Sequence, residues 1–177
     1  MNRIRAATEL DREAVRDVHL RAFPEGEGQM VARLAVDLLR EQRSPEIVSL
    51  VAEIDGAVVG HIAFSPVTVE NNEEWKGYIL APLGVKPEFQ NQRIGSALIG
   101  RGIERLSGSG VQVLFVYGDP GYYGKFGFNA DAASGYSPPF ELQFPFGWQA
   151  LRLNKEVFPE SAVAISCVAA LRDPALW

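Results

Sequence analysis

The sequence predicts an α/β fold in which a mixed, mostly antiparallel sheet of about seven strands packs against helices. Two observations predict it. In the first half, two helical segments are followed by strand-like runs joined by short turns, which is typical of an antiparallel meander. In the second half, a strand, a helix and a nearly all-apolar strand follow one another, which favours a parallel pair joined by a right-handed crossover.

The elements of the first half are read from hydrophobic spacing and turn residues. Strands are expected at 3–8, 47–54, 57–70 and 75–85, and helices at 9–23 and 29–42. Thr8 is the expected N-cap of the first helix, since its hydroxyl can accept a bond from the first turn. Asp55-Gly56 predicts a tight hairpin between the second and third strands.

The second half continues with one clear helix from Gly95 to Ser107, in which Ile99, Ile103 and Leu106 share a face. Further strands are expected at 111–118, 148–153 and 161–171, and a short helix within 119–128. Residues 137–147 are rich in Pro and aromatic residues and predict an ordered loop. No repeat or linker interrupts the chain, so residues 1–177 are expected to form a single domain.

Composition narrows the function classes. The net charge of -5 argues against nucleic-acid binding, which relies on cationic neutralisation of phosphates. Cys167 is the single cysteine, which excludes an internal disulfide and is compatible with a reducing compartment. The first residues contain no apolar signal core, and the chain has no long apolar run, so a cytoplasmic protein without a membrane span is expected. Two His and one Cys, widely spaced, predict no metal site.

The stretch "GVKPEFQNQRIGSALIG", Gly84 to Gly100, carries the main functional signal. Here a strand ends and a helix begins with small residues, so unpaired amides of the first turn could hold a phosphate. An ordinary strand-to-helix connection would have the same appearance. The residues that could contribute to a phosphate site are Gln90, Asn91, Gln92, Arg93, Gly95 and Ser96.

This stretch resembles the acyl-CoA-binding motif of the GCN5-related N-acetyltransferase (GNAT) superfamily, with Gln90, Arg93 and Gly95 at its marked positions. "GDPGYYGKFGF" is similar to the second signature, and its Asp-Pro form resembles the YhbS-like branch of predicted acetyltransferases. The resemblance covers about residues 3–128, with a late loop and C-terminal strands in 129–177. It implies helices on both faces of the sheet, and a fourth and fifth strand that splay apart.

Two positions depart from the family pattern. Arg93 stands where a glycine is usual, so a backbone with positive φ there would disfavour it, whereas a helical turn would tolerate it. Gly118-Asp119 stands where many relatives carry an Asn that contacts the pantetheine arm.

The resemblance implies roles for further residues. Backbone amides at Leu83 and Val85 would hold the thioester carbonyl, and Tyr123 would donate a proton to the leaving thiolate. The general base stays open among Glu25, Glu27, Glu53, His61, Glu73, Glu74 and Asp119, and His61 is more typical of a satisfied sheet residue. Candidate phosphate contacts are Lys86, Arg93, Arg101 and Lys125, any of which could be ordinary surface.

The sequence therefore predicts an N-acetyltransferase that uses acetyl-CoA and a small-molecule or peptide amine in a ternary complex. The negative net charge favours a cationic acceptor. The alternatives are a non-catalytic acyl-CoA-binding or sensing domain and a purely structural protein. A homodimer through the aromatic segments is compatible with any of the three.

Overall fold

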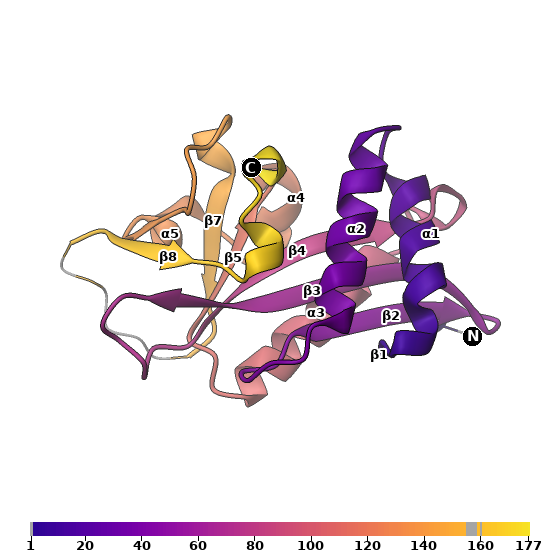
Figure 1. The fold of residues 1–177 in the computed structure, drawn as a ribbon, viewed down its shortest axis with the longest axis horizontal. Helices are drawn as coiled ribbons and strands as arrows, with labels where there is room; N and C mark the ends of the chain where they lie inside the picture. Colours follow the sequence, from indigo (N-terminus) through magenta and orange to yellow (C-terminus); the bar gives the residue numbers. More distant parts are fainter. Residues whose placement is uncertain (1, 155–158, 160) are drawn as a thin grey trace. The chain divides into compact units, whose positions relative to one another are not determined.

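The computed structural model describes residues 2–154, 159 and 161–177. In this part of the chain it is an α/β fold around an open, mostly antiparallel sheet of eight strands (Figure 1). Hydrogen bonds connect the strands in the order β1-β2-β3-β4-β5-β7, and β8 pairs with both β3 and β6 off this path. The predicted fold class is confirmed, with one short strand more than expected.

Contacts divide the chain into two compact units, and each unit is discontinuous in sequence. The first unit contains the residues up to Phe64 together with Ala81–Ile103. The second contains Ser65–Leu80 together with Glu104–Trp177. The strands β3 and β4 and the helix α3 each begin in one unit and end in the other.

The first unit contains two complete strands, parts of two more, and three helices, one of them in part. Its elements are β1 (Asn2–Ala6), β2 (Val48–Ile54), the first part of β3 (Ala57–Val69), the last part of β4 (Gly77–Val85), α1 (Arg12–Ala22), α2 (Glu27–Arg40) and most of α3 (Ile94–Gly108). A 3-10 turn, Glu9–Asp11, precedes α1, and Thr8 is its N-cap. Asp55 and Gly56 have φ values of 50° and 80°, which is the left-handed pair that a two-residue hairpin requires.

Helices cover both faces of these strands because side chains alternate along β3. His61 contacts His19 of α1, and the neighbouring cluster joins Val15 and Val18 of α1 to Val51 of β2. On the opposite face, Phe64 packs against Gly102 of α3, where a Cβ would overlap the phenyl ring. The apolar stripe of each helix is thus buried, which contributes about 1.5–3 kcal/mol for each fully buried aliphatic side chain.

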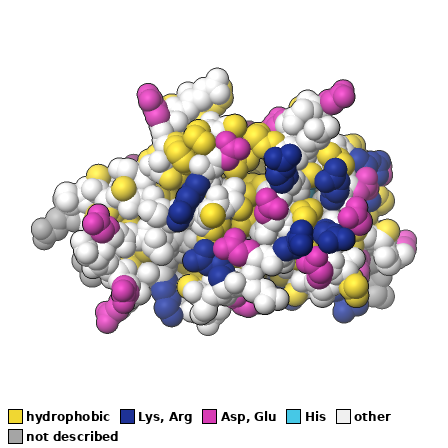
Figure 2. Space-filling model, in the orientation of Figure 1, with side chains coloured by type: hydrophobic (Ala, Val, Ile, Leu, Met, Phe, Trp, Pro, Cys, Tyr) yellow, Lys and Arg dark blue, Asp and Glu magenta, His cyan; other side chains and the backbone are white. Residues whose placement is uncertain are grey.

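The outer surface of α1 and α2 is a mixture of charges rather than a patch of one sign (Figure 2). Arg12 pairs with Glu9 at 3.4 Å, and Arg21 of α1 pairs with Glu88 at 2.7 Å. Exposed pairs of this kind contribute little stability, about 0–1 kcal/mol each. Their interspersed signs give this face no electrostatic preference for a polyanion.

The second unit is built around the strands β5 and β7 and a cluster of aromatic rings. Its elements are β5 (Val113–Tyr117), α4 (Pro120–Tyr123), α5 (Ala130–Ala133), β6 (Tyr136–Ser137), β7 (Trp148–Arg152) and β8 (Val163–Ser166), with the adjoining parts of β3, β4 and α3. β5 is parallel to β4 and antiparallel to β7, so its nearly all-apolar sequence lies between two strands. Phe115 stacks on Trp148 with ring centroids 5.1 Å apart, and Tyr136 packs edge-on against Phe115.

The pairing of β4 with β5 covers only the beginning of each strand. Among the described residues, the pairs run from Gly77–Val113 to Ile79–Phe115, although β4 continues to Val85 and β5 to Tyr117. This early end of the ladder agrees with the predicted splay of the fourth and fifth strands. It leaves the later backbone groups of β4 without a β5 partner.

The last predicted strand is shorter than expected. The sequence predicts one strand over 161–171, but β8 spans Val163–Ser166 and a 3-10 turn follows at Ala169–Leu171. The sequence also predicts neither α5 nor β6, which are four and two residues long. Such short elements depend on a cap or a neighbouring strand rather than on hydrophobic periodicity: the Ala132 N–H donates to the Asn129 side chain at 2.8 Å.

In the described parts of the chain, no helix has both the length and the apolar character needed to cross a bilayer.

Candidate functional site

The connection from β4 to α3 is held in shape by its own polar groups. The Lys86 N–H donates to the Val59 carbonyl at 2.9 Å, which fixes the start of the loop to β3. The side-chain amide of Gln90 donates to the Val85 carbonyl at 3.0 Å, and that of Gln92 donates to the Glu88 carbonyl at 3.3 Å. Two predicted ligand donors therefore also brace the loop, and each amide retains a second N–H.

Two residues of this loop adopt the left-handed conformation. Asn91 has φ 62° and Arg93 has φ 63°. Asn tolerates this region, whereas an Arg there costs about 1–2 kcal/mol. Arg93 thus has the positive φ that is unfavourable for an Arg, and the loop keeps a glycine-like path in spite of this side chain. Strain of this kind persists where the surroundings impose it, which is common at ligand-binding loops.

The loop leads into a helix start with three unpaired amides. The first intrahelical bond runs from the Ala97 N–H to the Arg93 carbonyl at 3.0 Å. The N–H groups of Ile94, Gly95 and Ser96 have no acceptor among the residues that the structure describes. Gly95 and Ser96 are half-buried and Arg93 is exposed, so an anion can approach these amides from solvent.

The end of β4 presents Leu83 and Val85 on one face and Gly84 on the other. Both Leu83 and Val85 are half-buried. Gly84 is buried against α1, because a Cβ there would lie 2.7 Å from Nδ1 of His19. The glycine in this strand is therefore explained by close packing against a histidine ring.

Tyr123 lies at the end of α4 in the second unit. Asp119 caps this helix, since its Oδ1 accepts from the Gly121 N–H at 2.8 Å and its carbonyl accepts from the Tyr123 N–H at 2.9 Å. The Tyr123 ring packs edge-on against Tyr122 and Phe128, and it leaves no room for a side chain at Gly118. Burial, followed by the nearby Tyr122, raises the pKa of the Tyr123 phenol. The phenol is thus protonated at neutral pH, and within the described chain its hydroxyl has no hydrogen-bond partner.

Most of the candidate bases have other partners or lie in solvent. Glu53 accepts two bonds from Arg5, at 2.6 and 2.9 Å. His61 is fully buried. One oxygen of Asp119 caps α4. The remaining acids, Glu25, Glu27, Glu73 and Glu74, are exposed.

Two of the candidate phosphate contacts also have partners within the protein. Lys86 pairs with Asp17 at 2.9 Å, and the Lys125 ammonium lies over the Tyr122 ring at 4.6 Å.

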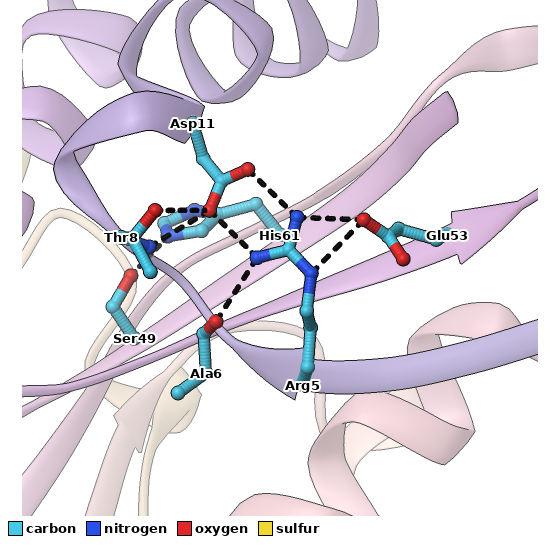
Figure 3. Close-up of polar contacts among 7 residues, drawn as sticks. All are labelled: Arg5, Ala6, Thr8, Asp11, Ser49, Glu53 and His61. Carbon is cyan, nitrogen blue, oxygen red and sulfur yellow. Dashed lines mark hydrogen bonds and ion pairs between the residues drawn. The ribbon is translucent and has the colours of Figure 1, made fainter. Parts of the chain in front are cut away.

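A partly buried ionic cluster ties β1 to the turn that precedes α1 (Figure 3). Arg5 donates to both oxygens of Asp11 at 2.7 and 2.8 Å, and to Glu53 on β2. The Thr8 N–H donates to the same Asp11 carboxylate at 2.7 Å. These bonds, with that to Arg5 the largest cause, lower the pKa of Asp11 to about 2. Sequence reasoning did not find this cluster, because its members are exposed types that only the fold brings together.

Sequence reasoning also missed His19. Its Nε2 lies 2.8 Å from Nδ1 of His61, whose Nε2 lies 2.7 Å from the Ser49 hydroxyl. Burial lowers the pKa of His19 to about 3, and burial together with His19 lowers the pKa of His61 well below its usual value. The sequence signal for a buried His19 is its position on the apolar stripe of α1, beside Val15 and Val18.

Within the described residues, no group of three His, Cys, Asp or Glu side chains could hold a metal ion.

Comparison with known proteins points to one family. Residues 12–128 match the Acetyltransferase (GNAT) family. YjhQ of Escherichia coli K12, named an uncharacterized N-acetyltransferase, is 37% identical over 134 residues, which are 75% of this chain and 72% of YjhQ. YhbS of the same strain, also named an uncharacterized N-acetyltransferase, is 31% identical over 130 residues, which are 73% of this chain and 74% of YhbS.

Solved structures agree with this match. The crystal structure of E. coli YhbS in complex with CoA superposes with a TM-score of 0.78 at 26% identity, covering 93% of this chain and 88% of that one. A GNAT family acetyltransferase from Brucella melitensis in complex with acetyl-CoA gives 0.71 at 34% identity, covering 93% and 95%. Both the fold and the sequence of these ligand-bound proteins are therefore similar to those of this chain.

Proposed function

The chain belongs to the acetyltransferase (GNAT) family, and we propose on that premise that it transfers an acetyl group from acetyl-CoA to a primary amine. The amine would attack directly in a ternary complex, without a covalent acyl-enzyme. The observation that carries the proposal is the row of unpaired amides at Ile94, Gly95 and Ser96, behind a loop kept in a glycine-like path. The CoA and acetyl-CoA complexes of the two similar structures support the choice of cosubstrate.

The loop would hold the pyrophosphate of acetyl-CoA. The amides of Gly95 and Ser96 would donate to its oxygens, helped by the positive end of the α3 dipole. The remaining N–H groups of Gln90, Asn91 and Gln92 would add neutral donors, and the exposed Arg93 would supply a charge-assisted bond. This arrangement needs no positive net charge, which fits a chain of net charge -5.

The backbone of β4 at Leu83 and Val85 would hold the acyl end. β4 has no β5 partner at these residues among the described pairs, so its backbone groups can serve a ligand. A donor aimed at the thioester oxygen stabilises the charge that develops there during attack. Loss of one such donor raises a reaction barrier by about 3 kcal/mol.

Tyr123 would donate its proton to the departing thiolate. The raised pKa keeps the phenol protonated until negative charge builds on sulfur. Desolvation of the departing thiolate would likewise raise its basicity, so donor and acceptor would remain matched. The half-buried ring and the unpartnered hydroxyl, as far as the described residues go, support this role.

A second candidate function is a non-catalytic acyl-CoA-binding or sensing domain. The strained Arg93 and the Gly118-Asp119 pair favour it, since both depart from the pattern of the superfamily. It predicts binding of acetyl-CoA without turnover. The two candidates therefore separate on whether CoA is released when amines are supplied.

The test combines calorimetric titration with acetyl-CoA and an assay of thiol release over a panel of primary amines. Ser96→Asp places a negative charge among the free amides without harming the helix, because acidic residues are favourable in the first turn. We expect it to weaken acetyl-CoA binding by at least about tenfold, which is 1.4 kcal/mol. Gly100→Asp is the matched control, since it adds the same charge to α3 at an exposed position with open space around it. Equal loss in both variants, or no binding by the unaltered protein at millimolar acetyl-CoA, would contradict the proposal.

A further inference from the structure

The second unit contains a cavity whose aromatic walls have no part in the roles proposed above. It has a volume of about 450 Å³ and lies between the end of β5 and the segment that precedes β7. Four aromatic side chains and two polar ones form most of its lining: Tyr117, Phe144, Phe146, Trp177, Asp119 and Gln143. A volume in this range suits a small organic molecule.

The cavity walls are fixed by hydrogen bonds of the protein itself. The Phe144 N–H donates to the Tyr117 hydroxyl at 2.9 Å, and the Gly118 N–H donates to the Gly147 carbonyl at 3.0 Å. Tyr117 stacks on Trp177 with ring centroids 6.2 Å apart, and the Trp177 indole N–H donates to the Leu171 carbonyl at 2.9 Å. The site is thus formed before any ligand arrives, which reduces the entropy lost on binding.

Two of the aromatic walls are unusually accessible. Phe144 is 50% exposed and Phe146 is 67% exposed, and their rings lie 5.8 Å apart. In the view of Figure 2, hydrophobic side chains gather on the surface near the C-terminal end that Figure 1 marks. Covering such rings with an apolar ligand gains about 25 cal/mol for each Å² removed from water.

The charge at the cavity is negative. Asp119 is exposed, and only its Oδ1 is used, by the Gly121 N–H. Its Oδ2 has no partner within the described chain, and none of the described lining residues is Lys or Arg. A free carboxylate oxygen beside aromatic faces attracts an ammonium group and disfavours an anion.

The cavity is also next to the proposed catalytic tyrosine. Gly118 lines the cavity, and a Cβ on the same residue would lie 2.5 Å from the Tyr123 ring. Gly118, which has no side chain, therefore lies between the cavity and the edge of the Tyr123 ring. A ligand in the cavity would reach the reaction from the side of β5 and α4.

We propose that this cavity binds the acceptor, and that the acceptor is a primary amine on an aromatic or branched apolar body. Asp119 holds its ammonium, and the rings of Tyr117, Phe146 and Trp177 hold its apolar part. The inference rests on the proposed function, since it names the acceptor of that reaction.

In the reaction, the ammonium gives one proton to solvent and the nitrogen lone pair forms a C–N bond as the C–S bond breaks. The thiolate takes the Tyr123 proton, and the phenolate takes the second proton of the nitrogen.

The experiment compares phenethylamine with ethanolamine, two primary amines that differ in their apolar body. Thiol release gives kcat and KM for each, and calorimetry measures phenethylamine binding without acetyl-CoA. The variants are Asp119→Asn, which keeps a good helix cap, and Phe146→Ala. Glu141→Gln is the matched control, because Glu141 is an exposed acid outside the cavity lining.

We expect phenethylamine to have the lower KM, and both cavity variants to raise that KM by about tenfold with little change in kcat. The affinity for acetyl-CoA, and the kcat and KM of Glu141→Gln, should stay as in the unaltered protein.

A preference for ethanolamine, or equal effects of Asp119→Asn and Glu141→Gln, would overturn the inference. Light scattering adds one more decisive outcome: if Phe146→Ala dissociates a dimer and phenethylamine does not bind, the aromatic face is an interface between copies. Phenethylamine binding that survives a failure to bind acetyl-CoA would support the cavity while rejecting the acetyltransferase proposal.

Discussion

Nε2 of His19 and Nδ1 of His61 lie 2.8 Å apart, with both rings fully buried between α1 and β3. Only one proton can lie between two imidazole nitrogens, and a charge on either ring would be without solvent. The chain of bonds ends at the Ser49 hydroxyl on one side. On the other side, Nδ1 of His19 faces Gly84 and has no partner in the described structure. An acceptor nitrogen is the less costly group to leave there, so we expect His19 to carry its proton on Nε2 and His61 on Nε2 as well.

This neutral pair predicts an acid-sensitive fold. The sequence has two histidines, and both belong to the pair. The unfolded chain binds a proton at each below a pH of about 6.5, while the folded chain keeps both neutral, with the pKa of His19 at about 3. Stability is therefore fully present above pH 6.5 and is lost as the pH falls from there toward 3. The free energy of unfolding from urea titrations should fall by up to about 2.7 kcal/mol per pH unit, or 1.4 for each histidine.

The control for this prediction is the double variant His19→Gln/His61→Gln. It lacks both imidazoles, so its free energy of unfolding should change little between pH 7 and 5. The Asp11 carboxylate, with its lowered pKa, adds its own loss of stability only at lower pH, as the pH falls toward 2. Parallel pH profiles of the double variant and the unaltered protein would contradict the neutral pair.

Arg93→Gly should separate strain from ligand binding. Glycine adopts φ 63° without the steric cost, so we expect the free energy of unfolding to rise by about 0.5–1 kcal/mol after the entropy of glycine is counted. The same change removes the guanidinium, and acetyl-CoA affinity should fall by about tenfold if that group bonds a phosphate. Arg93→Lys keeps a charge in the strained backbone and should retain part of the affinity. An unchanged affinity in Arg93→Gly would remove the side chain from the site.

Tyr123→Phe should lower kcat by about 100-fold or more, because it removes the proton donor and keeps the ring that packs on Phe128. Acetyl-CoA affinity, measured by calorimetry, should stay unchanged. Tyr122→Phe is the matched control, since it removes a neighbouring hydroxyl from the same helix. If the two variants behave alike when chemistry limits the rate, Tyr123 is not the acid.

Asp11→Asn should destabilise the first unit by about 2 kcal/mol, because a bidentate charge-assisted pair with Arg5 becomes a single neutral contact. The loss is moderated by Glu53, which still pairs with the guanidinium. Urea denaturation at pH 7 measures it. Glu13→Gln is the control, since its carboxylate is 80% exposed and its contact with Arg12 is long, at 3.4 Å. Equal stability of Asp11→Asn and the unaltered protein would show that the cluster fixes geometry without adding stability.

The sequence predicted the fold where local patterns decide the structure. Asp55-Gly56 specifies its hairpin through backbone conformation alone, and the apolar run of β5 indicates a strand between two others. It could not predict contacts set by distant residues. His61 meets His19 from 42 positions away, and Glu53 meets Arg5 from 48. Similarly, the residue type at Arg93 gives no sign of a positive φ, and the glycine that is usual there in the superfamily is the one signal for it. Among the site residues, those of the loop from Gln90 to Ser96 could be predicted from the sequence. The aromatic cavity could not, because its walls come from segments far apart in the chain.

The two units alternate along the chain, which affects the order in which the protein can fold during its synthesis. A ribosome releases the first 64 residues before the segment 81–103 that completes their unit, and between them it releases 65–80, which belongs to the other unit. We therefore expect the first unit to be completed after residue 103 has emerged, and the segment 65–80 to pair with β5 once Val113 has emerged. Neither unit is one uninterrupted stretch of the sequence. We expect the earliest compact intermediate of a nascent chain to leave residues 65–80 as a loop outside the first unit.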